Sequence, residues 1–346
     1  MLSASRKLTR VAPRATRSMA VKAATVKALM PELSAISTAV DALGASPSYA
    51  QVDNLIKSDP AFSATLEKVK AEDLSWAWAM LESKASKPPV TVAVVGAGSE
   101  VGAASLFRIA AGEMLGLDTP VALQLVGADA AVTKEVEACG FPLLTGITSA
   151  SSPAAALKGA SYAIVLEGDM KAVGAAAGAE TLVAVMGNAN AAAVAASSKA
   201  SVTAITRAVE MAAAKGLADA AGVPPTEVEN VIAWGTGVAD VSHATVAGKW
   251  ALKVVDSPLP AVESPKAAAA ADAVVAHMKD WALGSGGKWV SMGVPAVGDY
   301  GMGEGLFYSV PVVCTPGAYK RVGGVSLTPE VADVMEKERQ AILGGA

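Results

Sequence analysis

Apolar runs of two kinds alternate along most of this chain. Short runs rich in β-branched residues are each bounded by glycine, proline or polar residues; they occupy 90–95, 121–126, 162–166, 182–186 and 231–234. Between them, stretches such as 191–198 and 208–221 carry apolar positions at helical spacing. Buried strands that alternate with helices predict an α/β fold with a parallel, doubly wound sheet over residues 89–235.

The pattern changes after residue 235. Helical periodicity covers 265–283 and 329–343, whereas 289–292 and 307–313 have the composition of strands separated by a glycine-rich turn. Residues 236–346 are therefore predicted to form a second, α+β domain of the kind that carries a substrate site or an interface.

Residues 23–88 are predicted to be a helical extension. Apolar residues at three- and four-residue steps predict one helix up to Gly44, a second pattern covers 49–57, and a third runs from Pro60 towards Ala85. The third pattern carries Trp76 and Trp78, which are a large apolar load for a small extension. Two interpretations stay open: these tryptophans pack on the main domain, or they anchor a partner protein.

The first 22 residues have a different composition. Six basic side chains with serine and threonine between them precede the first acidic residue, Glu32. An arginine-rich, acid-poor N-terminus is typical of an organelle targeting segment, and its dense arginine favours the mitochondrion. A basic tail without a targeting role is the alternative.

Composition narrows the possible functions. The 346 residues are 52% hydrophobic and only 17% charged, with a net charge of -4. A nucleic-acid-binding protein would need a basic face, so this class is not expected, and a surface with few charges suits a subunit with covered faces. Charges, glycine or proline interrupt every apolar run before it could cross a bilayer. The two cysteines, Cys139 and Cys314, have no metal-ligand spacing, so no metal site is expected.

The glycines after the first predicted strand are the main candidate chemistry. Gly96, Gly98 and Gly102 follow the run 90–95 and precede a helical pattern, which is how a dinucleotide-binding unit begins. The spacing is imperfect, because Val101 stands where the third glycine of the usual pattern would fall. Glu100 also brings a negative charge to the place of a pyrophosphate. The three glycines are therefore interpreted as a vestigial cofactor site, with no cofactor expected.

Several segments together resemble the malate dehydrogenase family, in its cytosolic-type branch. They are LFRIAAGEMLGLDTPVAL (106–123), GNAN (187–190), ENVIAWG (229–235), DVSHATV (240–246), WVSMGV (289–294) and LFYSVPVV (306–313). The resemblance covers residues 90–346. It implies a Rossmann-type domain and a mixed C-terminal domain in a dehydrogenase fold that dimerises.

The resemblance also shows which catalytic positions have changed. The family places its acid/base histidine two residues after the Trp-Gly pair, where this chain has Gly237. The aspartate that orients the histidine falls at Val209, and a nearby substrate-binding arginine falls at Ala212. Both histidines of the chain, His243 and His277, are expected to be structural. No catalytic residue is therefore expected.

The loops of the family's substrate and cofactor sites differ as well. The segment 167–174 contains no arginine to hold a dicarboxylate, although Lys171 leaves one positive charge. Gly127 stands where NAD enzymes of the family have an acidic residue for the ribose, with Asp129 two positions later. Ser99 replaces a family glycine, whereas Asn188 and Asn190 persist. Together these changes predict a non-catalytic relative.

The expected function is that of a structural subunit in a large mitochondrial assembly, with other protein subunits as partners. The alanine-rich composition and the presequence resemble those of green-algal mitochondrial proteins, so the peripheral stalk or dimer contact of ATP synthase is the favoured host. An accessory role in a respiratory complex or in the mitochondrial ribosome stays open, because the sequence does not choose among these hosts. Two alternatives stay open: a nucleotide-sensing regulatory module, and a malate dehydrogenase with an altered active site.

Overall fold

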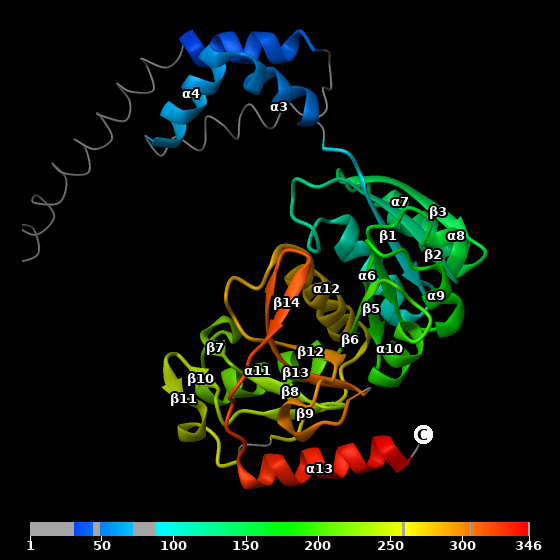
Figure 1. Ribbon diagram of the computed structural model, residues 1–346, viewed down its shortest axis with the longest axis vertical. Helices are drawn as coiled ribbons and strands as arrows, with labels where there is room; N and C mark the ends of the chain where they lie inside the picture. Colours follow the sequence, from blue (N-terminus) through cyan, green and yellow to red (C-terminus); the bar gives the residue numbers. More distant parts are fainter. Residues whose placement is uncertain (1–30, 44–48, 72–86, 258–259, 305, 345–346) are drawn as a thin grey trace, which may run out of the picture. The chain divides into compact units, whose positions relative to one another are not determined.

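The computed structural model of the chain describes residues 31–43, 49–71, 87–257, 260–304 and 306–344 (Figure 1). They fall into two compact units, one within Met1–Pro88 and the other within Pro89–Ala346. Among the described helices, none is both long and apolar enough to span a membrane. We call the two parts the N-terminal unit and the main unit.

The N-terminal unit is helical. Residues 31–41 form a helix, and α3 (Tyr49–Ser58) and α4 (Pro60–Ala71) follow. Asp59 accepts a hydrogen bond from the Ala61 N–H at 2.8 Å and so starts α4. Four buried aliphatic side chains form a small core: Ile36, Val40, Val52 and Ile56. The rest of the predicted third helix, with Trp76 and Trp78, lies outside the described residues.

The main unit is built on one nine-stranded sheet with the order β14-β13-β12-β6-β5-β4-β1-β2-β3. Six strands are parallel: β1 (Val90–Val95), β2 (Val121–Val126), β3 (Leu144–Ala150), β4 (Tyr162–Val165), β5 (Leu182–Met186) and β6 (Ser201–Ile205). Their order, 3-2-1-4-5-6, is that of a doubly wound dinucleotide-binding fold. The predicted fold class is confirmed.

Helices cover both faces of this sheet (Figure 1). They are α6 (Glu100–Ala110), α7 (Ala130–Ala138), α8 (Pro153–Ala156), α9 (Met170–Ala176), α10 (Asn188–Ala195), α11 (Arg207–Ala221), α12 (Ala267–Leu283) and α13 (Pro329–Gly344). Two clusters of buried apolar side chains result: one is lined by α6 and α12, the other by α9 and α10. Because helices bury both of its faces, the sheet needs apolar side chains on each.

Strands from the C-terminal part extend the same sheet. They are β12 (Val290–Pro295), β13 (Phe307–Thr315) and β14 (Ala318–Arg321), all antiparallel. β12 joins the parallel part by pairing Gly293 with Ala204 of β6. A Cβ at Gly293 would lie 2.5 Å from the Cβ of Ala204, so the join requires glycine.

One predicted strand lies elsewhere. Residues 231–234 were expected in the parallel sheet, but β8 (Ile232–Trp234) pairs antiparallel with β9 (Val238–Asp240) in a separate two-stranded sheet. The prediction is wrong because Gly235 and Gly237, both with positive φ, turn the chain back on itself. The buried Trp234 Nε1–H also donates to Asp240 Oδ2 at 2.8 Å and fastens the two strands together.

A three-stranded sheet of β11 (Lys249–Trp250), β10 (Thr245–Val246) and β7 (Val228–Glu229) completes the strands. The short 3₁₀ turns are η1 (Pro225–Glu227), η2 (Ala251–Lys253) and η3 (Asp299–Gly301). Of these elements, η1, β7 and β10 contact α11, and Ala251 of η2 belongs to the same apolar cluster.

Candidate functional site

The turn between β1 and α6 contains the three predicted cofactor glycines. Gly96 has φ +84°, and a Cβ on Gly98 would lie 2.1 Å from the carbonyl oxygen of Gly127 at the end of β2. A Cβ on Gly102 would lie 2.4 Å from the Gly96 carbonyl oxygen. Each glycine is therefore required by close backbone packing, whether or not a ligand binds.

The N-terminus of α6 is capped by its own chain. Ser99 Oγ accepts a hydrogen bond from the Gly102 N–H at 3.1 Å and donates one to the Gly96 carbonyl at 2.8 Å. In a dinucleotide site such N–H groups are directed at the pyrophosphate. Here the Gly102 N–H donates to the Ser99 side chain instead.

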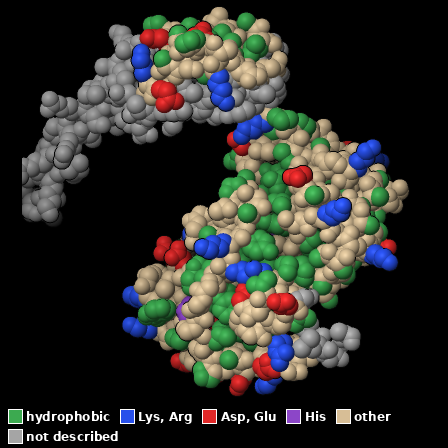
Figure 2. All heavy atoms as spheres, viewed as in Figure 1, with side chains coloured by type: hydrophobic (Ala, Val, Ile, Leu, Met, Phe, Trp, Pro, Cys, Tyr) green, Lys and Arg blue, Asp and Glu red, His purple; other side chains and the backbone are tan. Residues whose placement is uncertain are grey.

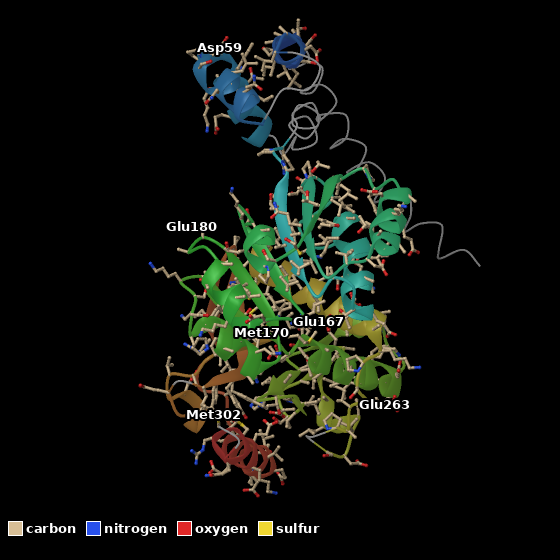
Figure 3. The ribbon with its side chains drawn as sticks, turned by 90° about the vertical axis from the view of Figure 1, so that its right-hand side faces the viewer. Asp59, Glu167, Met170, Glu180, Glu263 and Met302 are labelled. Atoms are coloured by element: carbon tan, nitrogen blue, oxygen red, sulfur yellow. The ribbon has the colours of Figure 1, made fainter. Side chains whose placement is uncertain are left out.

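Acidic side chains surround the same turn. Glu167 follows β4, and its Cγ lies 2.5 Å from the Cβ position of Gly96; Figure 3 labels it close to Met170, where α9 begins. Glu100 opens α6, and Asp129 accepts from the Val132 N–H at 2.8 Å as the N-cap of α7. Three carboxylates near the turn oppose a pyrophosphate, and Asp129 is already engaged. These residues do not fit an anionic dinucleotide.

Gly237 and Val209 lie side by side. Gly237 follows β8 and Val209 lies in the first turn of α11, yet a Cβ built on Gly237 would be 3.2 Å from Val209 Cγ2. Ala212 lies one turn further along α11. The fold thus brings together the two positions where the resemblance places a histidine and its aspartate, and neither residue can ionise.

A carboxylate from the C-terminal helix reaches the same turn. Glu338 of α13 accepts hydrogen bonds from the Thr236 N–H at 3.3 Å, from the Thr236 hydroxyl, and from the Tyr308 hydroxyl at 3.3 Å. A Cβ on Gly235 would lie 1.7 Å from Glu338 Oε2. Burial, and then the adjacent Glu338 carboxylate, raise the pKa of Tyr308 far above its usual range. A dicarboxylate substrate would meet this negative charge beside Gly237.

Comparisons with known proteins agree with this geometry. Residues 261–343 match the α/β C-terminal domain of lactate/malate dehydrogenase. In this segment the chain is similar to the lactate/malate dehydrogenase family. A malate dehydrogenase from Naegleria fowleri is 29% identical, with a TM-score of 0.65 over 74% of this chain and 96% of that one.

Other members of the family share the fold at lower identity. The lactate dehydrogenase of Trichomonas vaginalis, solved with NADH and oxamate, is 23% identical, with a TM-score of 0.66 over 74% of this chain and 96% of that one. The malate dehydrogenase of Cryptosporidium parvum is 14% identical, with a TM-score of 0.59 over 74% of this chain and 98% of that one. These two structures establish the dehydrogenase fold for this chain.

The histidines of this chain lie in structural surroundings. His277 is buried on α12, and its Nε2 lies 2.9 Å from Thr203 Oγ1; burial, and then Arg207, lower its pKa to about 3. His243 lies between two hydroxyls, with Ser242 Oγ at 2.9 Å and Ser326 Oγ at 3.2 Å. His277 therefore stays neutral at physiological pH, and His243 has partners for both ring nitrogens.

Asn188 and Asn190 also have backbone partners. Asn188 Nδ2 donates to the Gly235 carbonyl at 2.8 Å, and Asn190 Nδ2 donates to the Met186 carbonyl at 2.9 Å. In the predicted substrate loop, Asp169 accepts from the Ala172 N–H at 3.0 Å and caps α9. These three polar side chains therefore form hydrogen bonds with backbone groups.

No sequence pattern predicts the role of Glu338. It lies 102 residues from Thr236, and its position in α13 has the ordinary pattern of a charged helix face. A second group was also missed: Arg207 pairs with Glu210 and with Asp280 beneath the loop that enters β12. Neither group carries a local motif that could have revealed it.

Proposed function

We propose that this protein is a non-catalytic member of its dehydrogenase family. The adjacency of Gly237 and Val209 carries the proposal, because the acid/base pair must occupy these two positions and neither residue can transfer or hold a proton. Loss of acid/base catalysis alone costs about 10²–10⁴-fold in rate. Ala212 further removes the arginine expected on the same face of α11.

The cofactor side supports the same proposal. Ser99 caps the helix that would receive the pyrophosphate, Gly127 offers no carboxylate to the ribose, and Glu167 lies against Gly96. Substrate, cofactor and proton donor would each lack their main contact. Losses that act on one catalytic unit are not additive, so the remaining groups are not expected to compensate for them.

The structural role rests on what the chain keeps. The dehydrogenase fold is intact, and charged side chains are scattered sparsely over the face of the main unit in Figure 2. The N-terminal unit adds a helical module, and the basic first 22 residues predict import into the mitochondrion. We propose a structural subunit of a large mitochondrial complex, with the peripheral stalk or dimer contact of an algal ATP synthase as the host.

Turnover of malate tests the catalytic half of the proposal. Purified full-length protein, assayed for NADH formation with malate and NAD, is expected to give no rate above a blank without enzyme. An ordinary dehydrogenase rate would refute the proposal and establish altered active-site chemistry. Thermal denaturation with NAD and NADH distinguishes a nucleotide sensor from a structural subunit. A ligand that binds the folded state raises the midpoint of thermal unfolding, so a sensor should show this rise and a structural subunit should not.

Native electrophoresis of mitochondria, followed by mass spectrometry of the bands, tests the structural half. The protein is expected to migrate with a complex of high mass, and co-migration with ATP synthase subunits identifies the proposed host. Migration as a free dimer would contradict a structural-subunit role, whatever the malate assay shows.

A further inference from the structure

A cavity of about 640 Å³ lies between α11, the loop 225–231 and the segment that connects α12 to β12. Its walls include none of the glycines of the β1–α6 turn, and neither Gly237 nor Val209. The volume is within the range of pockets that hold small molecules. The cavity is therefore a site of its own, independent of the proposed loss of catalysis.

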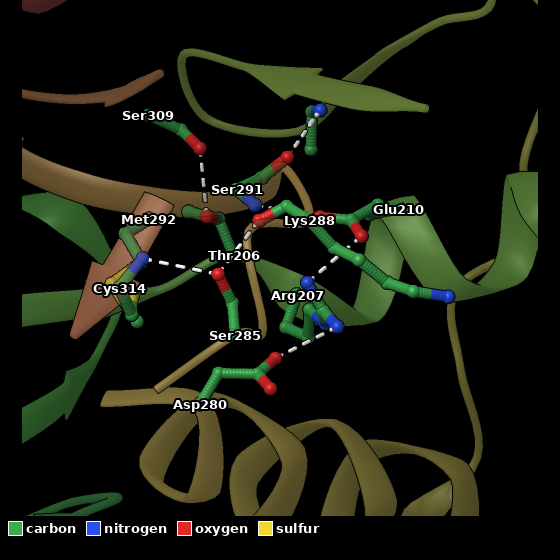
Figure 4. A network of polar contacts seen from close by, with 11 residues as sticks. Thr206, Arg207, Glu210, Asp280, Ser285, Lys288, Ser291, Met292, Ser309 and Cys314 are labelled. Carbon is green, nitrogen blue, oxygen red and sulfur yellow. Dashed lines mark hydrogen bonds and ion pairs between the residues drawn. The ribbon is translucent and has the colours of Figure 1, made fainter. Parts of the chain in front are cut away.

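Its inner wall carries an excess of negative charge. The Arg207 guanidinium lies between two carboxylates, with Nη1 at 2.9 Å from Glu210 Oε1 and Nη2 at 2.9 Å from Asp280 Oδ2 (Figure 4). Glu210 Oε2 also accepts the Ser291 N–H at 2.6 Å, which holds that carboxylate against β12. One cation against two carboxylates leaves one unit of negative charge on this wall when both are ionised.

Burial makes this arrangement costly without a further partner. It raises the pKa of both Glu210 and Asp280. Within the described residues, Arg207 Nη1 and Asp280 Oδ2 have these ion-pair contacts but no partner in hydrogen-bond geometry, and buried Arg207 Nε has no hydrogen-bond partner. An ionised carboxylate has several acceptor sites, so Asp280 can still accept a hydrogen bond from a ligand.

The mouth of the cavity carries one charge of each sign. Lys288 and Glu229 form an ion pair at 3.3 Å, with 66% and 52% of their side chains exposed. Gly286 and Gly287, both with positive φ, bring the backbone to the same rim. Lys288 can exchange Glu229 for a bound ligand at little cost in free energy, because an exposed ion pair contributes at most about 1 kcal/mol.

We propose that this cavity binds a small zwitterion of the α-amino acid type. The ammonium group takes the inner wall beside Asp280, where the negative charge is in excess, and the carboxylate lies at the rim beside Lys288. A simple carboxylate would have to approach Glu210 and Asp280, whereas a simple amine would make no contact with Lys288, which would keep Glu229 as its partner. A ligand that carries both charges can bind Asp280 at the inner wall and Lys288 at the rim.

Titration calorimetry of the full-length protein tests this assignment. The panel is a set of α-amino acids together with, for each, the amine that lacks the carboxylate and the acid that lacks the amino group. The amino acid is expected to bind at least about tenfold more tightly than either analogue, because each analogue loses one charged hydrogen bond. Equal binding of amine and amino acid, or no binding by any member at millimolar concentration, would overturn the proposal.

Variants of the rim and of the wall locate the two ends of the ligand. Lys288→Gln is expected to weaken amino-acid binding by up to about fivefold and to leave amine binding unchanged, since Lys288 is exposed. Asp280→Asn is expected to weaken both the amino acid and the amine by about tenfold or more. Arg207 keeps Glu210 as a partner in that variant, and circular dichroism checks its fold.

Lys215→Gln is the matched control. Lys215 also belongs to α11 and forms an exposed ion pair, with Asp219 Oδ1 at 2.7 Å, but it does not line the cavity. Its replacement should leave binding unchanged. A loss equal to that of Lys288→Gln would show that bulk charge, and not the cavity, governs binding.

Discussion

Replacing His277 should reduce the loss of unfolding free energy that occurs when the pH is lowered. The imidazole is 1% exposed, its Nε2 lies 2.9 Å from Thr203 Oγ1, and burial followed by the charge of Arg207 lowers its pKa to about 3. The unfolded chain has an ordinary histidine with a pKa of about 6.5. Between these two values the unfolded state binds more protons than the folded state. The free energy of unfolding therefore rises with pH over this window and falls on acidification.

The size of the effect follows from linkage. His277 contributes a slope of about 1.4 kcal/mol per pH unit in the window, and its stability contribution falls by about 2 kcal/mol from pH 8 to pH 5. This figure depends little on the folded pKa as long as that pKa stays well below 5. Glu210 and Asp280 have raised pKa values from burial, so they act in the opposite direction. They are present in both proteins, and comparing wild type with a variant isolates the histidine.

The measurement is urea unfolding at a series of pH values for wild type and His277→Gln, in which the amide can still bond with Thr203. The variant should lose about 2 kcal/mol less than wild type between pH 8 and pH 5. Asn190→Gln, which changes no titratable side chain, is the control, and its pH dependence should follow that of wild type. Parallel curves for wild type and His277→Gln would refute the assignment of a neutral, buried imidazole.

Three substitutions test the packing of the main unit. Gly98→Ala should lower the unfolding free energy by about 2 kcal/mol or more, because its Cβ would lie 2.1 Å from the Gly127 oxygen; Gly216→Ala, with no atom within 4 Å, should raise it by about 0.5–1 kcal/mol. Chemical denaturation of both variants checks this pair, and equal effects would contradict the close approach. Trp234→Phe should cost about 1–3 kcal/mol, since it leaves Asp240 Oδ2 buried without its 2.8 Å donor. Thermal unfolding measures that loss, and an unchanged midpoint would mean that the bond contributes nothing.

The fold could be predicted where burial alone determines a segment. The β-branched runs 90–95, 121–126 and 182–186 coincide with β1, β2 and β5, because both faces of those strands meet helices. β3 was missed because its sequence LTGITSA is partly exposed and carries glycine, threonine and serine. β8 was assigned to the wrong sheet because periodicity reveals a strand but not its partner.

Only part of the candidate site could be predicted from the sequence. The altered positions Gly237 and Val209 could be named from neighbouring motifs, and their contact needed only the family's fold. Glu338 and the Arg207–Glu210–Asp280 group depend on how α13 and α12 meet distant turns. Such contacts between elements far apart in sequence leave no local pattern, and only coordinates reveal them.

The pairing of β6 with β12 has a mechanical consequence. Gly293 and Ala204 join the parallel strands to the antiparallel ones, so a single sheet runs from β3 to β14. A load applied at one edge passes through a row of laterally bonded strands with no hinge at residue 235. The pairing of β6 with β12 depends on Gly293, because a side chain there would separate the parallel strands from the antiparallel ones. A protein that transmits force within an assembly, as proposed for this chain, would benefit from this continuity.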